Sequence, residues 1–459
     1  MDFERLGRRK IAIWGYGREG QAALAVLRQR MPDKPLALIL SEEEAAQWDF
    51  SVDPLLTIYT EEPSAGLLGQ FQVIIKSPGI SPYGELFDWA RFRGSRFISG
   101  TQLWFTEHAQ DRSICITGTK GKSTVSAMVA HLLRSAGQRT ALAGNIGMPL
   151  LELLEPDPPP EWWVIELSSF QTVELGDAVP AVAAVLNLSP EHLDWHGDVE
   201  RYYSDKLKIL AGDRADVAVL NAADPELMKR TQHLERRILF NHGAGWHVAD
   251  GWICDGSVQV LPCADLPLRG RHNQINAAAA LAIVEACGLN ARELAPHLAS
   301  FKALPHRLQL VGEADGRRYV NDSIATTPAA TLEALNAFAG EPVALLVGGH
   351  DRGLDWSEFA RALSANPPAA VIGVGAHGGR IIDLLDQQPL GNCQLLRCPD
   401  LAGAVLAAQE VLSRGVILLS PGAPSFDAFS DYRARGRAFA AAAGFAEVEL
   451  GEVEGLGIG

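Results

Sequence analysis

The sequence has no long hydrophobic run, few cysteines and no excess of positive charge. No stretch approaches the roughly 18 consecutive apolar residues of a membrane helix, and the opening MDFERLGRRK lacks the apolar core of a signal peptide. Only six of the 459 residues are cysteines, scattered with no CxxC pair, which favours buried, reduced thiols over disulfides. We therefore expect a cytoplasmic protein that does not associate with membranes.

The charge balance is acidic, with 40 Lys and Arg against 55 Asp and Glu and a net charge of −15. Nonspecific nucleic-acid binding depends on Lys and Arg that neutralise phosphates, so we expect no nucleic-acid partner. An anionic substrate would need local positive charge or helix N-termini. The composition, 47% hydrophobic and 21% charged, is otherwise ordinary for a globular enzyme, and we expect a monomer.

Short apolar runs recur along the chain, each followed by a glycine-rich turn and a helical pattern. This alternation predicts an α/β fold of βαβ units with parallel sheets, in which ligands lie beyond the carboxyl ends of the strands. Domain boundaries are expected near residues 100–112 and near 300, and a β-rich insert over 236–272. The apolar runs cover residues 11–14, 73–76, 114–117, 182–188, 217–222, 343–349, 371–376 and 416–423.

Residues 15–20, GYGREG, form a complete G-x-G-x-x-G after the first apolar run. The pattern is typical of a dinucleotide site, where the pyrophosphate lies at a helix N-terminus. Acidic residues 42–44, after the next apolar run, could bind a ribose. The same turn serves the diphosphate of a UDP-sugar, and it also packs a helix on a sheet with no ligand. This loop alone leaves all three interpretations open.

A second loop, TGTKGKST at 117–124, lies between an apolar run and a helical pattern. Ile116 stands where the standard P-loop has its first glycine, so the loop is short. The short loop can still bind a triphosphate. Its backbone N–H groups and the helix N-terminus can face phosphates, Lys122 can reach the β- and γ-oxygens, and Ser123 can hold Mg²⁺. We predict ATP binding, with an ordinary glycine turn as the alternative. The helix is supported by an apolar stripe at Val125, Met128, Val129, Leu132 and Leu133.

Polar residues follow two later apolar runs. Glu166 ends one of them, where a carboxylate is costly unless it pairs or binds a cation. We expect it to hold Mg²⁺ with Ser123 and phosphate oxygens, and His192 to be a minority ligand. Taken alone, Lys206 is most simply a surface helix lysine. The block that carries these candidates, NLSPEHLDWHG, supplies Glu191, His192, Asp194 and His196.

The order of the motifs matches a known family. TGTKGKST, GNIG at 144–147, ELSSFQ, EHLDWHG with DKLKI, HNQINAAAA at 272–280, PHRLQ at 305–309 and NDSIATTP at 321–328 together resemble the Mur ligases. These cytoplasmic enzymes build the peptide stem of bacterial peptidoglycan. KSPGISP at 76–82 and the GREG loop are similar to the glutamate-adding members, which join glutamate to UDP-N-acetylmuramoyl-L-alanine. The resemblance covers the whole chain.

The resemblance implies three domains: a Rossmann-like UDP-sugar-binding domain over 1–108, a P-loop ATPase-like central domain with a parallel sheet over 109–300, and a Rossmann-like amino-acid-binding domain over 301–459. It assigns GYGREG to the uridine diphosphate and not to NAD(P). It implies ligation through an acyl phosphate, with ATP, two Mg²⁺ ions and a carbamylated Lys206 as a metal ligand.

Individual roles follow by matching the motifs, as implications of the resemblance. Metal would be held by Ser123, Glu166, His192 and carbamylated Lys206, and the catalytic residues would be Lys122, Lys206, His192 and Asn145. ATP would contact Gly118, Thr119, Lys120, Gly121, Lys122, Ser123, Thr124, Asn273, Asn276, Arg307 and Asp322, the two asparagines at the adenine. The UDP-sugar substrate would contact Gly15, Tyr16, Gly17, Arg18, Ser77 and Asn145, and glutamate would contact Thr326, Arg352, Ser425 and Tyr432. Helix capping is the alternative for Asn273, and a surface ion pair for Arg352.

Four positions depart from the usual glutamate-adding pattern, all in the amino-acid domain. SPGAPSFDAFSDY places Gly422 and Pro424 where small residues stand in SPACASFDQF, and Tyr432 where Phe is usual; Ile324 replaces a lysine. A branch of the family known from xanthomonads, which adds L-glutamate, is similar here. We expect L-glutamate, with D-glutamate as the alternative. An NAD(P)-dependent oxidoreductase and a non-catalytic nucleotide-binding regulator are the alternatives from other classes.

Overall fold

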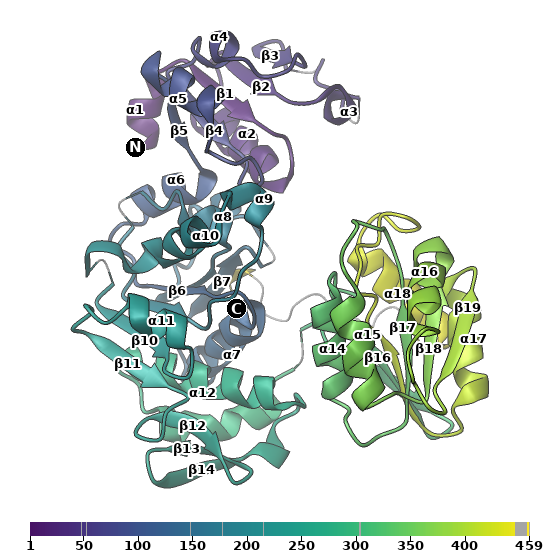
Figure 1. Ribbon diagram of the computed structural model, residues 1–459. Coiled ribbons are helices and arrows are strands. Elements are labelled where there is room, and N and C mark those ends of the chain that lie inside the picture. The colour runs from purple at the N-terminus through teal and green to yellow at the C-terminus, as the bar shows by residue number, and fades with distance from the viewer. Residues whose placement is uncertain are drawn as a thin grey trace. The chain divides into compact units, whose positions relative to one another are not determined.

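The computed structural model describes residues 1–46, 48–51, 53–146, 148–176, 178–213, 215–302, 304–445 and 457–458. Its contacts divide the chain into two units. One comprises Met1–Asp265, Ile275–Ala299 and Gly455–Gly459, and the other Leu266–Gln274 and Ser300–Glu454. Strands and helices alternate through most of the described chain (Figure 1), which confirms the predicted α/β class.

The first sheet has five parallel strands in the order β3-β2-β1-β4-β5. The strands are β1 (Ile11–Trp14), β2 (Leu36–Ile39), β3 (Leu56–Tyr59), β4 (Val73–Lys76) and β5 (Arg96–Ile98). The helices of this segment are α1 (Phe3–Gly7), α2 (Arg18–Arg30), α3 (Glu42–Ala45), α4 (Ala65–Leu68), α5 (Glu85–Phe92) and α6 (Gly100–Glu107). β2 and β4 are buried along their whole length, as in parallel sheets covered on both faces. GYGREG directly follows β1, so it lies at the carboxyl end of the central strand.

The second sheet has seven strands in the order β11-β10-β9-β6-β8-β7-β21, and only β21 runs antiparallel to its neighbour. The strands are β6 (Ser113–Thr117), β7 (Thr140–Gly144), β8 (Trp162–Glu166), β9 (Val182–Val185), β10 (Val217–Asn221), β11 (Arg237–Phe240) and β21 (Gly457–Ile458). Because β6 and β8 are parallel neighbours, the phosphate loop and Glu166 meet at one edge of the sheet.

The helices of the middle segment follow these strands. They are α7 (Lys122–Ser135), α8 (Ser169–Thr172), α9 (Leu193–His196), α10 (Val199–Lys206), α11 (Pro225–Arg230), α12 (Arg271–Ala286) and α13 (Ala291–Leu294), with 3₁₀ turns η1 (Leu150–Leu153), η2 (Leu207–Asp213), η3 (Cys263–Asp265) and η4 (Ala295–Ser300). The predicted β-rich insert is present. It forms a small antiparallel sheet of β12 (Trp246–Ala249), β13 (Trp252–Asp255) and β14 (Val258–Pro262).

The third sheet, in the second unit, has the order β15-β16-β20-β17-β18-β19, parallel except for β15. The strands are β15 (Gln309–Ala314), β16 (Arg317–Asn321), β17 (Val343–Val347), β18 (Ala370–Val374), β19 (Gln394–Cys398) and β20 (Gly415–Leu419). The helices are α14 (Pro328–Asn336), α15 (Ser357–Ala365), α16 (Gly375–Leu385), α17 (Leu401–Val411) and α18 (Tyr432–Ala442). Two apolar cores, one built on Leu345 and Val371 and one on Leu346 and Ile372, use alternate residues of these strands.

The predicted boundaries fall between sheets. The interval from β5 to β6 contains residue 108, and the interval from β14 to β15 contains residue 300. The assignment of three domains with these bounds stays a prediction. No disulfide joins the six cysteines, all of which the structure describes; the predicted burial holds for Cys115, Cys254 and Cys287, whereas Cys263, Cys393 and Cys398 are half-buried.

Candidate active site

The phosphate loop joins β6 to α7, as the sequence predicts. Gly118 has φ +155° and Gly121 φ +86°, backbone conformations that glycine adopts without strain. Gly121 is the N-cap of α7 and provides no side-chain cap. A Cβ at Gly121 would lie 2.6 Å from Oδ1 of Asn276 on α12. The missing side chain therefore lets the loop backbone approach Asn276 closely.

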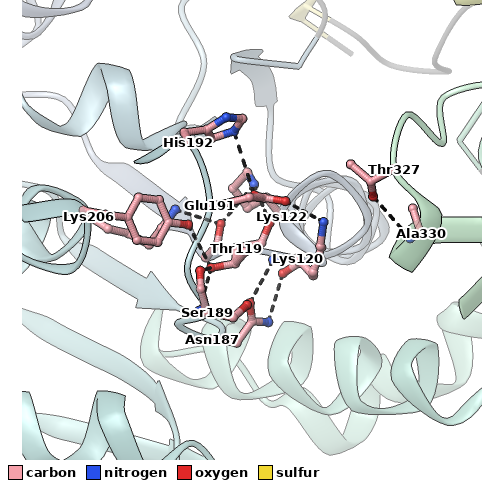
Figure 2. Close-up of polar contacts among 12 residues, drawn as sticks. Thr119, Lys120, Lys122, Asn187, Ser189, Glu191, His192, Lys206, Thr327 and Ala330 are labelled. Atoms are coloured by element: carbon pink, nitrogen blue, oxygen red, sulfur yellow. Dashed lines mark hydrogen bonds and ion pairs between the residues drawn. The ribbon is translucent and has the colours of Figure 1, made fainter. Parts of the chain in front are cut away.

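Residues that follow β9 hold this loop (Figure 2). Asn187 Oδ1 accepts a hydrogen bond from the Lys120 backbone N–H at 2.8 Å, and Asn187 Nδ2 donates to the Lys120 carbonyl at 3.1 Å. The Asn187 carbonyl accepts from the Thr119 N–H at 3.1 Å. Because Asn187 accepts hydrogen bonds from the N–H groups of both Thr119 and Lys120, these two groups are already paired. The backbone donors for a phosphate would therefore come from the N-terminus of α7. Asn187 was not among the predicted site residues; its place as a polar residue inside the apolar run 182–188 was the signal that could have found it.

Two further contacts tie the same segments. Thr119 Oγ1 donates to the carbonyl of Ser189 at 3.0 Å and lies 2.9 Å from the Tyr202 hydroxyl. Lys120 Nζ forms an ion pair with Glu191 Oε1 at 2.7 Å. Thr119 and Lys120 therefore shape the loop through their own side chains. Tyr202 was not predicted to have a role at this site.

Lys122 and Lys206 both donate to the carbonyl of Gly118, each at 3.0 Å. Lys122 also donates to the Thr119 carbonyl at 3.0 Å. Lys206, at the end of α10, is only 2% exposed, so it is not the surface lysine that its sequence suggests. Burial, and then the neighbouring Lys122, lower the pKa of Lys206 well below its ordinary value. The site therefore contains an amine with a strong tendency to be neutral beside the phosphate loop.

Glu166 ends β8 next to this loop and is 1% exposed. Its Oε1 accepts a hydrogen bond from Nδ2 of Asn145 at 2.8 Å, and the Asn145 backbone N–H donates to the Glu166 carbonyl at 2.9 Å. Its Oε2 is buried and has no hydrogen-bond partner among the described residues. Because a buried carboxylate oxygen without a partner is costly, the donor set fits a hard cation such as Mg²⁺.

His192 precedes α9 in a left-handed conformation, with φ +54°. Its side chain is half-exposed, its ring centroid lies 4.9 Å from that of Phe170, and its Nε2 is 3.9 Å from Glu191 Oε2. Partial burial lowers the pKa of His192, an effect that Glu191 opposes. A neutral imidazole is the form that can bind a metal.

His196, four residues later, is fully buried and has a structural role. Its Nδ1 lies 2.8 Å from Asp205 Oδ2, and its Nε2 lies 3.0 Å from Ser169 Oγ. Tyr83 also donates to Asp205, at 2.7 Å, from the segment after β4. This network was not predicted. It connects the KSPGISP segment with α10, the helix that ends at Lys206.

The remaining predicted phosphate contacts lie on the first turn of α7. Ser123 is half-buried and Thr124 is 3% exposed. Among the described residues, no three acidic, histidine or cysteine side chains gather into a ready-made metal cluster. The predicted metal set contains only two residues of these kinds, Glu166 and His192. Its other ligands would be the Ser123 hydroxyl and the carbamate of Lys206.

The GYGREG loop leads from β1 into α2. Gly15 has φ +85° and accepts a hydrogen bond from Ser77 Oγ at 3.2 Å. A Cβ at Gly20 would lie 2.1 Å from the Gly15 carbonyl oxygen, so the third glycine packs the helix on the turn. Gly17 is the N-cap of α2 with no side-chain cap, and the neighbouring Arg18 is exposed. The geometry suits a diphosphate at this helix N-terminus.

Tyr16 of this loop is half-buried and makes edge contacts with Trp48 and Phe50. Its N–H donates to Glu44 Oε1 at 3.4 Å, while the other oxygen of Glu44 caps α3 in a capping box with Ser41. Glu44, one of the acidic residues considered for a ribose, is thus already engaged with backbone N–H groups.

The remaining predicted ATP contacts belong to the second unit. Asn273 Nδ2 donates to the Arg269 carbonyl at 2.7 Å, a contact of the helix-capping kind. Arg307 Nε is buried without a hydrogen-bond partner among the described residues. Asp322 is 5% exposed and accepts from Ser420 Oγ at 2.8 Å and from the Leu308 N–H at 3.2 Å. Burial raises the pKa of Asp322 to about 7.

Three of the predicted glutamate contacts lie on loops at the carboxyl ends of strands of the third sheet, and the fourth, Tyr432, begins a helix. Thr326 follows β16 and is half-buried, just before Thr327, which caps α14 through its hydroxyl. Arg352 follows β17 and is exposed, and no ion pair between described residues involves it, so the surface ion pair considered for it is not found. Ser425 follows β20 and is 2% exposed, and Tyr432 begins α18 half-buried.

The first unit therefore brings together the phosphate loop, Asn145, Glu166, His192 and Lys206, and separately forms the GYGREG turn with Ser77. In the second unit, the Tyr432 carbonyl accepts a hydrogen bond from Ser323 Oγ at 2.8 Å, which links Tyr432 to the NDSIATTP motif. Each set is described within its own unit. The individual ligand roles stay predictions.

Comparisons with known proteins identify the family. Two family models match, the Mur ligase middle domain over residues 116–284 and the Mur ligase, glutamate ligase domain over residues 306–423. A UDP-N-acetylmuramoyl-L-alanine–L-glutamate ligase of Xanthomonas euvesicatoria is 51% identical over 471 residues, covering 100% of both chains.

Two solved structures share the fold. The UDP-N-acetylmuramate-alanine ligase of Thermotoga maritima has a TM-score of 0.56 and 20% identity, covering 94% of this chain and 98% of that one. A folylpolyglutamate synthase of Mycobacterium tuberculosis, complexed with ADP, has a TM-score of 0.55 and 18% identity, covering 71% and 91%.

The family models and the full-length relative show that the chain belongs to the Mur ligase family. The predicted family membership is confirmed. Within the described part of the chain, every helix is too short or too polar to span a bilayer.

Proposed function

We propose that this chain is an ATP-dependent, ADP-forming ligase that joins L-glutamate to UDP-N-acetylmuramoyl-L-alanine through an acyl phosphate. The observation that carries the proposal is the convergence, at one phosphate loop, of Lys122, Lys206 and the open oxygen of the buried Glu166 carboxylate. The name of the 51% identical relative supports the two substrates. The ADP complex of a structure with the same fold supports ATP as the energy source.

The reaction needs activation because a carboxylate is a poor electrophile at neutral pH. An oxygen of the substrate carboxylate attacks the γ-phosphorus; the new O–P bond forms as the bond to the β–γ bridging oxygen breaks, and ADP leaves. The neutral amine of glutamate then attacks the acyl carbon, the C–O bond to phosphate breaks, the amine proton passes to solvent, and inorganic phosphate leaves. Positioning and charge neutralisation are the protein's main contributions.

Lys122 and the N-terminus of α7 supply positive charge where negative charge gathers. The γ-phosphate and the attacking carboxylate repel each other, and a preorganised ammonium with a helix N-terminus offsets that repulsion. Lys122 would exchange its bonds to the Gly118 and Thr119 carbonyls for phosphate oxygens. Asn145, anchored on Glu166, would contact the UDP-sugar substrate near the acyl carbon.

Glu166 would be the main protein ligand of Mg²⁺, through the oxygen that has no partner among the described residues. Ser123, His192 and carbamylated Lys206 would complete the set for two ions. Mg²⁺ bound there would neutralise phosphate oxygens and polarise the γ-phosphoryl group.

Lys206 would act as a carbamate. Its neutral amine would attack the carbon of CO₂, forming an N–C bond while one C=O π bond becomes a carboxylate oxygen and the nitrogen releases a proton. Burial and the low pKa of Lys206 support the neutral amine that this step requires. The change also places an anion beside the Lys122 ammonium, where a protonated Lys206 would be repelled.

The substrates would divide among the three proposed domains. Residues 1–108 would bind the uridine diphosphate at the open N-terminus of α2, with Gly15, Tyr16, Gly17, Arg18 and Ser77 as its contacts. Residues 109–300 would bind ATP. Residues 301–459 would supply glutamate through Thr326, Arg352, Ser425 and Tyr432, where the exposed Arg352 suits a dicarboxylate because a guanidinium binds carboxylates bidentately.

Asn273 and Asn276, with Arg307 and Asp322, would serve the adenine, ribose and phosphates of ATP. Asn276 is supported by its closeness to Gly121. Arg307 is supported by its buried Nε, which has no hydrogen-bond partner among the described residues. Asn273 also has a capping contact, so its adenine role has the weaker support.

L-glutamate is preferred over D-glutamate on two grounds. The full-length relative is named for the L-enantiomer. The departures at Ile324, Gly422, Pro424 and Tyr432 all fall in the amino-acid domain, where the orientation of the amine is set.

The test measures phosphate release by the purified protein with ATP, Mg²⁺ and UDP-N-acetylmuramoyl-L-alanine, with L-glutamate or D-glutamate. We expect turnover with L-glutamate alone. Turnover with D-glutamate alone would keep the ligase and reject the enantiomer. No turnover with either, combined with tight NADH binding seen by fluorescence, would favour an oxidoreductase at GYGREG.

A further inference from the structure

Gly422 and Trp356 lie against each other in the second unit. Gly422, in the loop after β20, has φ +68°, and a Cβ there would lie 2.3 Å from Cη2 of Trp356 and 2.9 Å from its Cζ2. It would also lie 2.9 Å from Oγ1 of Thr331 on α14. The indole ring therefore occupies the space that any side chain at position 422 would need. Two sequence features that stand far apart in the chain, GGHDRGLDW and SPGAPSF, are complementary in space.

Trp356 is held rigidly. It is 5% exposed, directly precedes α15, and its ring makes edge-to-face contacts with Phe359, at a centroid distance of 5.1 Å, and with His377, at 6.0 Å. Its indole Nε1 is buried with no hydrogen-bond partner among the described residues. A buried indole N–H without a partner is costly, so shape and not hydrogen bonding explains why a tryptophan stands here.

The contact lies where the three loops of the predicted glutamate site are joined. The Gly348 N–H donates to the Pro421 carbonyl at 2.9 Å, and the His350 N–H donates to the Pro424 carbonyl at 2.8 Å. Thr331 Oγ1 donates to the Ser420 carbonyl at 3.1 Å. The loop before Arg352, the loop before Ser425 and the helix after Thr326 therefore share one anchored junction, with the Trp356 ring at its centre.

We propose that Trp356 and Gly422 are positioning residues that fix how the loops of Arg352, Ser425 and Thr326 are arranged and thereby select the enantiomer of glutamate. The inference rests on the proposed ligase function. Neither residue needs to touch the substrate. The rigid ring, facing a position with no side chain, sets how closely the two loops approach.

The chemistry of chirality gives the physical reason. When the side-chain carboxylate of glutamate is held at one point, the two enantiomers direct the amine and the α-carboxylate to exchanged positions. The protein can tell the two apart only when at least three contacts, to the side-chain carboxylate, the amine and the α-carboxylate, are held in a fixed, handed arrangement. Because packed interiors respond to the addition of a single methyl group, the Trp356–Gly422 contact can fix this arrangement from behind the site.

The first variant is Gly422→Ala, which adds the excluded Cβ. Gly391→Ala is its matched control: Gly391 lies in the same unit at φ +58°, and a Cβ added there would meet no described atom within 4 Å. Both changes carry the strain of alanine at positive φ. We expect Gly422→Ala to raise KM for L-glutamate by about tenfold or more and to lower the L-to-D ratio of kcat/KM by a similar factor, since displacements near 1 Å have effects of this size.

The same measurements include a readout that a general loss of structure would not produce. KM for UDP-N-acetylmuramoyl-L-alanine should change by less than about threefold in Gly422→Ala, because this substrate is assigned to residues of the other unit. Gly391→Ala should leave KM for L-glutamate and the enantiomer ratio at the wild-type values.

The second variant tests the pairing itself. Trp356→Phe shortens the ring that blocks position 422, so the double variant Trp356→Phe/Gly422→Ala should recover part of the L-to-D ratio lost in Gly422→Ala. Trp356→Phe alone should also lower the L-to-D ratio of kcat/KM, because the smaller ring no longer fills the space beside Gly422. If Gly422→Ala does not fold, Trp356→Phe alone decides: an unchanged ratio rejects the inference.

The inference is overturned if Gly422→Ala only lowers the thermal midpoint, while its KM for L-glutamate and its enantiomer ratio equal those of Gly391→Ala. It is also overturned if the defects of the two substitutions simply add. Failure of the proposed function is distinguishable, because the wild-type protein would then release no phosphate in response to either enantiomer.

Discussion

The phosphate loop and the predicted glutamate site are built in different ways. In the first unit, polar side chains converge on the loop: Asn187 brackets the Lys120 backbone, and Lys122 and Lys206 donate to one carbonyl. In the second unit, backbone groups converge on one buried side chain. Arg435 is 4% exposed and donates to the carbonyls of Ser323, Ala423 and Pro424 and to the Ser323 hydroxyl.

This difference indicates what each region is able to do. The phosphate loop holds the Lys122 amine and a helix N-terminus beside a buried carboxylate oxygen without a described partner, an arrangement that suits a polyanion bound together with a metal cation. In the glutamate site Arg352 is exposed, while the buried Arg435 holds the neighbouring loops together. Burial lowers the pKa of Arg435 to about 10. Damage to the first region should act on chemistry, and damage to the second on amino-acid binding and stability.

The largest effect should come from Lys122→Ala. Loss of the ammonium at the γ-phosphate removes charge stabilisation, and we expect phosphate release to fall about a thousandfold, equivalent to about 4 kcal/mol. The measurement is glutamate-dependent phosphate release at saturating ATP. Lys229→Ala, on the exposed face of α11, is the control for the loss of one positive charge. A fall of less than about threefold in Lys122→Ala would remove this lysine from the mechanism.

Lys206→Ala should follow, with a loss of about a hundredfold, or about 2.7 kcal/mol. The expected signature is chemical rescue, because a small carboxylate such as acetate can occupy the space of the missing carbamate. Lys122→Ala provides the comparison, since acetate cannot replace a cation. Equal behaviour of the two variants towards acetate, with no response of the wild type to bicarbonate, would contradict the carbamate.

Glu166→Gln should have a smaller effect, about tenfold to a hundredfold on turnover. The amide keeps an acceptor for Asn145 but removes the anionic oxygen that we assign to Mg²⁺. The Mg²⁺ concentration for half-maximal activity should therefore rise, while the thermal midpoint stays equal or increases, because an unpartnered buried charge is lost. An unchanged Mg²⁺ dependence would show that Glu166 is not the main ligand.

The sequence predicted the first region better than the second. Glycine-rich loops between apolar runs and helices identified the phosphate loop, and Glu166 was found because a charged residue ends a buried strand. Burial of Lys206 could not be predicted, since it depends on the packing of α10 against the loop. Asn187 and the His196–Asp205 pair were missed for the same reason.

In the second unit, the motifs indicated the strands and the residues of the loops, but not how the loops are joined. Arg435 is an ordinary helix arginine in the sequence, and its role appears only when three loops meet at α18. Gly422 was noted as a departure from the usual pattern, whereas Trp356 lies in a separate segment, GGHDRGLDW. Their contact depends on the order of the strands in the sheet, in which β20 and β17 are neighbours.

The smallest effect, and the one that sharpens the comparison, concerns Asp322. Burial raises its pKa from 3.8 to about 7, so between these values the folded protein binds more protons than the unfolded chain, and stability falls as pH rises. His306 acts oppositely. Burial, with Arg433 and Arg437 nearby, lowers its pKa from 6.5 to about 4, so it contributes stability that is lost as pH falls through that window.

The two groups therefore oppose each other between about pH 4 and 6.5, which makes a single variant informative. Asp322→Asn removes the acidic group and keeps acceptors and donors for Ser420 and Leu308. Its thermal midpoint relative to wild type should rise steadily from about pH 4 to about pH 7. A difference that is constant across this range would mean that Asp322 is ionised throughout, paired with Arg307, and that the second unit also relies on a buried charge pair.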